Sequence, residues 1–296
     1  MPVRQELLPT FSRDVLHTGQ VENNPDQKKK QIIPTASAIL DDGTLVEMVS
    51  QPKQRRTVFA IYSAGRWTLQ DGIDLGSDAR LVPFSPNNNL IKNDVVMLPS
   101  EPSIYGSEEK LVAEIEQFIH HYVDFNPSFE KVATYYVLLT WLYDAFNELP
   151  YLRLRGDYGS GKTRALLTIG SLCYRGFFAS GASTVSPIFH TLNAFKGTLI
   201  FDEADFRFSD EKAEVVKSLN NGNVRGLPVL RTLMNQQREF NPQAFHVFGP
   251  KIVAMRGSYD DKGLFAAICG SSETRASDTG CNSMTCPLWL WRTGSQ

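Results

Sequence analysis

The chain has 296 residues, of which 42% are hydrophobic and 21% are charged, and its formal net charge is −2. This length is enough for one large domain or for two modest ones, each with its own buried core. The charge balance excludes a global basic field, so any contact with DNA has to come from a local patch.

The sequence shows neither an export signal nor a membrane span. The first 14 residues mix charged and apolar side chains and lack the apolar centre of a signal peptide. The longest apolar candidate, Val132 to Phe146, is too short to cross a bilayer, which takes about 20 residues. The sequence therefore predicts no membrane association and, by default, a cytoplasmic location.

The first third of the chain divides into a polar arm and a β-rich region. Residues 1–33 include three consecutive lysines, which are typical of a flexible solvated arm, with a phosphate-contacting patch as the alternative. Residues 34–106 are predicted to form a small β-rich domain that carries no evident chemistry. Its strand-like segments, separated by turn signals, are Ala36 to Leu40, Thr44 to Val49, Thr57 to Ser63 and Gly65 to Leu69.

Two helices are predicted between residues 107 and 147. Ser107 is suited to cap the first helix, and Ser128 is predicted to cap the second, after a break that contains a proline. The second helix is apolar on most of its faces, which predicts burial in the core. On the first helix, His120 has no evident partner in the sequence.

Residues 150 to 256 alternate between strand and helix patterns, which is typical of a parallel sheet flanked by helices. The fold class is therefore α/β, with residues 107–262 forming a helical lead-in and a nucleotide-binding core. The predicted elements are strands at Tyr151 to Arg155, Gly176 to Ala179, Thr198 to Phe201 and Lys251 to Met255, and helices at Lys162 to Tyr174, Ser186 to Phe195 and Asp210 to Leu219.

One segment matches the phosphate-binding pattern G-x-x-x-x-G-K-[ST], and it lies between a predicted strand and a predicted helix. Glycines allow the backbone N–H groups to surround an anion, and the following helix directs its partly positive N-terminus toward the phosphates. Lys162 is expected to reach the β- and γ-phosphates, and the Thr163 hydroxyl to bind Mg²⁺. The predicted ATP-binding residues are Gly156, Asp157, Tyr158, Gly159, Ser160, Gly161, Lys162 and Thr163.

A pair of acidic residues follows the short apolar strand at Thr198 to Phe201. An acid at the end of such a strand holds Mg²⁺ in P-loop ATPases, so Asp202 is the predicted metal ligand together with Thr163. Glu203 is predicted to act as a general base on the attacking water. Asp205 is interpreted as structural or solvated.

With both motifs in place, residues 150–262 resemble the AAA+ class of P-loop ATPases, and most of all the superfamily 3-like ATPases of phage and plasmid primase–helicases. The resemblance rests on the two motifs and on Val247 to Ala254, which is similar to the strand that precedes the sensor residue. It implies Mg-ATP hydrolysis coupled to DNA unwinding or translocation in mobile-element replication. It also implies single-stranded DNA as a partner, a hexameric ring, and a γ-phosphate-sensing role for Arg256.

In the same family, the segment Gly222 to Gln243 lies where a hairpin or pore loop can occur. Three arginines in it, Arg225, Arg231 and Arg238, are candidates for facing DNA or a neighbouring subunit. A solvent-facing connection is the alternative.

The chain departs from the family pattern after residue 262. Residues 263–296 are rich in Ser, Thr, Gly and Cys and show no sustained helical period. They are therefore predicted to form an atypical tail. The hypothesis that explains it is a chain that is truncated, or read out of frame, from about residue 263. Without the expected arginine finger and helical lid, hydrolysis would be impaired. The alternative function is therefore a nucleotide-binding switch or assembly module with little or no hydrolysis.

Overall fold

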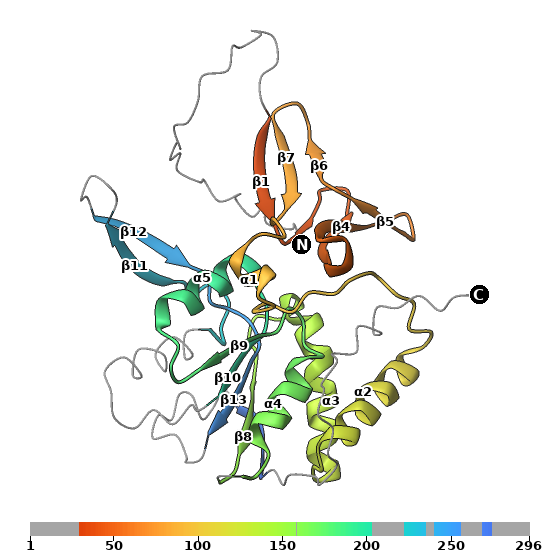
Figure 1. Cartoon of the computed structure of the whole chain (residues 1–296), viewed down its shortest axis with the longest axis vertical. Coiled ribbons are helices and arrows are strands. Elements are labelled where there is room, and N and C mark those ends of the chain that lie inside the picture. Colours follow the sequence, from red (N-terminus) through yellow and green to blue (C-terminus); the bar gives the residue numbers. More distant parts are fainter. Residues whose placement is uncertain (1–29, 158, 203–221, 235–239, 256–267, 274–296) are drawn as a thin grey trace.

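A five-stranded parallel sheet organises the larger part of the molecule (Figure 1). The computed structural model describes residues 30–157, 159–202, 222–234, 240–255 and 268–273. The strand order is β14-β8-β13-β10-β9, and every neighbouring pair is parallel. This arrangement confirms the mixed α/β class. The strands are β8 (Tyr151–Arg155), β9 (Phe177–Ser180), β10 (Leu199–Asp202), β13 (Lys251–Met255) and β14 (Ile268–Glu273).

Helices cover both faces of this sheet, as its apolar strands require. Alternate residues of each strand enter different cores: Leu152 and Ile200 face α2 (Glu108–Tyr122), α3 (Pro127–Trp141) and α4 (Lys162–Gly170), whereas Tyr151 and Phe201 face α5 (Val185–Phe195). The predicted burial of the second lead-in helix is confirmed on the face of α3 that includes Ala133 and Val137. None of the described helices is both long and apolar enough to cross a membrane.

The helix after the glycine-rich loop is shorter than predicted. It ends at Gly170 instead of Tyr174, because tertiary contacts hold the following residues in turns. The Tyr174 backbone N–H donates to the Thr140 hydroxyl at 3.0 Å, and its carbonyl accepts from the Thr198 N–H at 3.0 Å. The helix predicted at 210–219 lies outside the described residues.

The β-rich region contains two small sheets. One is antiparallel with the order β2-β3-β4-β5, and the other has the order β1-β7-β6. Strand β1 begins at Gln31, inside the predicted arm, and the rest of that arm up to residue 29 lies outside the described residues. The elements are β1 (Gln31–Thr35), β2 (Ser37–Ile39), β3 (Leu45–Gln51), β4 (Arg56–Ser63), β5 (Arg66–Gln70), β6 (Ile73–Leu75), β7 (Ala79–Pro83), α1 (Asn89–Lys92) and the 3₁₀ turn Pro52–Gln54.

The β-rich region and the parallel sheet share one hydrophobic core. Val46, Met48 and Phe59 of the β-rich region belong to the same buried cluster as Phe195 of α5 and Phe201 of β10. This cluster crosses the predicted boundary between residues 34–106 and 107–262.

Two further elements lie in the segments that were predicted to form a hairpin or pore loop and an atypical tail. An antiparallel hairpin, β11 (Val229–Met234) with β12 (Phe240–Phe245), occupies the segment for which a hairpin or pore loop was expected. Strand β14 pairs with β8, so the sheet extends into the predicted tail at 263–296; the tail's residues 263–267 and 274–296 lie outside the described residues.

The lead-in helices differ in how well their caps were predicted. The Ser107 side chain accepts from the Lys110 N–H at 3.3 Å, as predicted. The prediction of Ser128 as the second cap is wrong, because Asn126 is the N-cap and accepts from the Ser128 N–H at 2.9 Å. Pro127 can then take the first helical position, which suits its fixed φ and its missing N–H.

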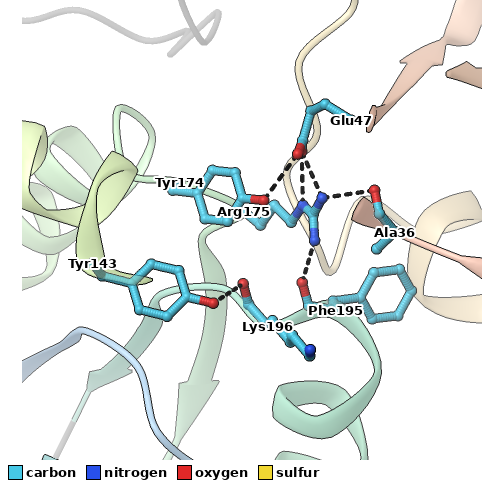
Figure 2. Close-up of polar contacts among 7 residues, drawn as sticks. All are labelled: Ala36, Glu47, Tyr143, Tyr174, Arg175, Phe195 and Lys196. Atoms are coloured by element: carbon cyan, nitrogen blue, oxygen red, sulfur yellow. Dashed lines mark hydrogen bonds and ion pairs between the residues drawn. The ribbon is translucent and has the colours of Figure 1, made fainter. Parts of the chain in front are cut away.

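A buried arginine joins the β-rich region to the parallel sheet (Figure 2). The Arg175 guanidinium, whose side chain is 0% exposed, donates to the Glu47 carboxylate of β3 at 2.6 and 3.0 Å and to the carbonyls of Ala36 and Phe195 at 2.7 and 2.6 Å. Tyr174 also donates to Glu47, at 3.0 Å. Burial raises the pKa of the Glu47 carboxyl, although the Arg175 charge and these hydrogen bonds oppose the shift.

Two more cations hold the amino-terminal edge of the sheet together. The Lys251 ammonium is buried at the start of β13 and donates to the carbonyls of Gly222, Val247 and Gly249 at 2.9–3.1 Å. Arg225 donates to the carbonyls of Asp144 and Phe146 and lies over the Phe248 ring. Each of these cations donates to carbonyl groups of loops beside the sheet, outside the hydrogen-bond ladder of its strands.

We expect Arg175→Met to lower the free energy of unfolding by about 3–5 kcal/mol, the usual cost of removing one partner of a buried ion pair. The substitution removes the cation that faces the Glu47 carboxyl, which keeps only the Tyr174 hydroxyl as a donor, and it removes the Arg175 bonds to the Ala36 and Phe195 carbonyls. Urea unfolding followed by circular dichroism measures the change.

The matched control is Lys110→Met, which removes an exposed cation 3.9 Å from Glu114 on α2. An exposed pair of this kind contributes about 0.3–0.5 kcal/mol. If Arg175→Met shifted the unfolding midpoint no more than Lys110→Met does, the assigned role of Arg175 would be refuted.

His120, which has no evident partner in the sequence, contacts the second lead-in helix. Its Nδ1 lies 3.0 Å from Oε2 of Glu130, and the hydrogen bond and charge of Glu130 raise the pKa of His120. Since the folded pKa lies above the unfolded one, the stabilisation is complete below pH about 6.5 and is lost as the pH rises through the folded pKa.

We therefore expect an NMR titration to give His120 a pKa above 6.5 in the wild type. The variant Glu130→Gln should return the pKa toward 6.5. Equal titration midpoints in the two proteins would contradict the assigned pair.

Candidate nucleotide and metal site

The candidate site lies at the carboxyl-terminal edge of the parallel sheet. Because all five strands run in the same direction, Gly156 after β8, Asp202 at the end of β10 and Met255 at the end of β13 lie at this one edge. In open α/β sheets, ligands bind outside the carboxyl ends of the strands. The sheet therefore brings together two motifs that are about 40 residues apart in the sequence.

The glycine-rich segment leaves β8 and returns into α4. Gly159 and Gly161 have φ of +74° and +84°, a left-handed conformation that glycine adopts without strain, and Gly161 is the N-cap of α4. The Gly156 N–H donates to the Met255 carbonyl at 3.4 Å, which ties the start of the loop to β13. The Ser160 N–H and hydroxyl both bond to the Asp157 carbonyl, at 3.3 and 2.8 Å.

Lys162 reaches back over this loop from the first position of α4. Its ammonium donates to the carbonyl of Gly156, to that of Asp157 at 2.5 Å and to the Ser160 hydroxyl at 3.4 Å. A cation, the helix N-terminus and a glycine loop thus converge on one small volume. Such a volume favours a multiply charged anion.

Thr163 and Asp202 meet at the same edge. The Thr163 hydroxyl donates to Oδ2 of Asp202 at 2.8 Å. Both oxygens are hard ligands of the kind that Mg²⁺ prefers, and neighbouring oxygens of an octahedral shell with bonds of about 2.1 Å lie about 2.9 Å apart. The pair therefore fits two adjacent positions around Mg²⁺, with the remaining positions left for phosphate and water. Among the described residues there is no cluster of three or more His, Cys, Asp or Glu side chains that could hold a metal without such help.

Three predicted site residues, Tyr158, Glu203 and Arg256, lie outside the described residues. The seven other loop residues and Asp202 are described and lie together at this edge.

The predicted arginines of Gly222 to Gln243 have different surroundings. Arg225 is engaged with the Asp144 and Phe146 carbonyls, so the prediction that it faces DNA or a neighbour is not supported by its contacts. Arg231 lies over the Phe189 ring at 4.6 Å, and Arg238 is outside the described residues. Sequence reasoning missed Arg175 and Lys251, because a single buried cation leaves no pattern in the sequence.

The sequence matches no protein-family model and no curated protein. Among solved structures, it is similar to JCV helicase, at 17% identity over 58% of this chain and 46% of that chain, with a TM-score of 0.36. It is also similar to the FIGL-1 AAA domain, at 15% identity over 53% of this chain and 59% of that chain, with a TM-score of 0.32. The matches thus cover about half to three-fifths of those chains. At such scores, chemistry has to be inferred from the residues of this chain.

We expect Thr163→Val and Asp202→Asn each to weaken Mg²⁺-dependent binding of a fluorescent ATP analogue. Losing one charged hydrogen-bonding or metal contact of about 1.5–3 kcal/mol corresponds to roughly 10- to 100-fold in Kd. Binding measured in EDTA should change far less, because the pair acts through the metal.

Thr184→Val is the matched control, since Thr184 precedes α5 at the same edge and its side chain makes no capping bond. The assignment fails if Thr163→Val and Thr184→Val have the same effect, or if the losses in EDTA equal those in Mg²⁺.

Proposed function

We propose that this chain binds Mg-ATP at the loop of residues 156–163 and hydrolyses it. The observation that carries the proposal is the 2.8 Å contact between Thr163 and Asp202 beside a loop that Lys162 crosses. A glycine loop alone would bind many anions. A hydroxyl and a carboxylate placed for one metal next to that loop favour a nucleoside triphosphate with Mg²⁺.

Each residue then has a distinct task. The N–H groups of the loop and of the first turn of α4 hold the phosphate oxygens, and Lys162 exchanges its carbonyl partners for the β- and γ-phosphates. Thr163 and Asp202 would hold Mg²⁺, which neutralises the charge that develops on the phosphates. Glu203 as general base and Arg256 as γ-phosphate sensor remain predictions.

We further propose that hydrolysis drives movement on DNA, with single-stranded DNA as the polymer and a ring of copies as the working form. The hairpin β11–β12 supports this proposal: it projects from the sheet beside α5 (Figure 1), and its Leu230 side chain is 70% exposed. The alternative remains a nucleotide-dependent switch or assembly module with little hydrolysis.

The test is steady-state ATP hydrolysis by the wild type and by Lys162→Ala, each with and without single-stranded DNA. We expect Lys162→Ala to lose at least about 100-fold in kcat, because it removes a cation that stabilises the transferring phosphoryl group. DNA should stimulate the wild type.

The control is Lys131→Ala, which removes an exposed lysine of α3 that is not part of the loop of residues 156–163. Wild-type turnover that is insensitive to DNA would refute the motor but retain the ATPase. Binding that depends on Lys162 without turnover would establish the switch, and an absence of nucleotide binding would refute the proposal entirely.

A further inference from the structure

Strand β5 (Arg66–Gln70) forms an open edge of the four-stranded sheet. All five of its residues are exposed, and its partner in the sheet is β4. Within the part of the chain that the structure describes, its other edge takes no backbone partner. Such an edge presents unpaired N–H and C=O groups that can pair with another strand.

Some other sheet edges in the described part of the chain are protected. The outer side of β9 is closed by the neighbouring segment, where Val96 bridges to Phe177 and the Met97 N–H donates to the Gly176 carbonyl at 2.9 Å. Strands β2 and β6 have three residues each, which is too short for stable pairing. Strand β5 has five residues, no proline or lysine, and no bulge in its register with β4, so it lacks several of the features that block edge pairing, and its one charged residue, Arg66, lies at its end.

The face beside this edge carries a row of exposed apolar side chains. In the strand register, Ile39 lies opposite Leu45, Leu45 opposite Tyr62, and Tyr62 opposite Trp67, so the row crosses all four strands. The Tyr62 and Trp67 rings lie 5.0 Å apart. Leu69, which is 42% exposed, adds to the row at the edge.

The turn between β4 and β5 determines which backbone groups face outward. Ala64 and Gly65 have φ of +48° and +77°, the pattern of a two-residue type I′ hairpin. In such a hairpin the flanking residues Ser63 and Arg66 form a hydrogen-bonded pair, and the bonding alternates along the ladder. Thr68 therefore bonds to β4, whereas Trp67 and Leu69 direct their N–H and C=O groups to the open edge.

We propose that β5 pairs antiparallel with β5 of a second copy of this chain, about a two-fold axis through Thr68. In this register Trp67 of one copy forms a hydrogen-bonded pair with Leu69 of the other copy, and the two-fold axis repeats this pair on its other side. The outward backbone groups are thereby matched. A two-fold interface of this kind is isologous, so it requires a self-complementary strand.

The sequence of β5 meets this requirement. Trp67 packs beside Leu69 of the second copy, so the two apolar rows join across the interface and the exposed indole is covered. At each end, Arg66 lies opposite the neutral Gln70 of the second copy, so no like charges face each other across the interface. A peptide of unrelated sequence would gain the backbone bonds without this complementarity.

The first experiment measures the mass of the full chain by light scattering over a wide concentration range. It is done without nucleotide and in the Lys162→Ala background, so that nucleotide-driven ring assembly does not contribute. We expect twice the chain mass of 33.2 kDa, falling to the monomer on dilution. The variant Leu69→Pro should be monomeric throughout, since it removes an outward N–H and leaves the bonds to β4 intact.

The second experiment uses Thr68→Cys, because residues that face each other across the axis as a non-hydrogen-bonded pair have Cα atoms about 4.5 Å apart. This distance permits a disulfide. We expect covalent dimers under mild oxidation from Thr68→Cys. In Arg66→Cys the two introduced cysteines do not face each other across the axis. This variant should therefore give no more covalent dimer than the wild type, whose native cysteines set the background.

A monomeric parent protein at all concentrations would overturn the proposal. So would an oligomer that persists in Leu69→Pro while Thr68→Cys fails to cross-link, since association would then use another surface. Neither result bears on ATP binding, which is tested separately through Lys162.

Discussion

The rest of the structure depends on a fully buried guanidinium. Arg175 is separated from the start of β9 by Gly176 and has φ of +43°, a strained conformation for an arginine that positions its side chain between the β-rich region and α5. The backbone must pass close by at Gly197, where a Cβ would collide with the Arg175 carbonyl. A guanidinium is the side chain that can satisfy a carboxylate and two carbonyl oxygens at once in a fixed planar geometry. The two parts of the chain are therefore held together by directional bonds as well as by the shared hydrophobic core.

The two edges of the parallel sheet are used in opposite ways. The amino-terminal edge contains three cations that donate to main-chain carbonyls and so hold the loops in place: Arg175, Lys251 and Arg225. At the carboxyl-terminal edge, Lys162 and the Thr163–Asp202 pair belong to a glycine-rich turn and to a strand end. In a parallel sheet all carboxyl ends of the strands lie at one edge and all amino ends at the other. Residues that stabilise the fold and residues of the candidate site can therefore lie at separate edges.

Much of this arrangement could be predicted from short-range patterns. Strands β8, β9, β10 and β13 and helices α2, α3 and α5 were predicted within a few residues, because their apolar periodicity and flanking turns are local signals. The meeting of Thr163 with Asp202 was expected from the two motifs and from the common direction of the strands that precede them. The end of α4, the Asn126 cap and the roles of Arg175 and Lys251 could not be predicted, since each depends on partners far away in the sequence or on a choice between adjacent capping residues.

The state of Lys162 in this structure is consistent with the proposed exchange of partners. Its ammonium rests on the neutral carbonyls of Gly156 and Asp157, acceptors that are weaker than ionised phosphate oxygens. Replacing them with the β- and γ-phosphates gains charge-assisted bonds and frees the two carbonyls at a partly exposed loop, where water can satisfy them. The glycines at 159 and 161 already have the left-handed angles of the loop, so this replacement requires movement of the lysine side chain and little rearrangement of the backbone. A site arranged in this way loses little ordering free energy on binding, which is consistent with the proposed role of the loop.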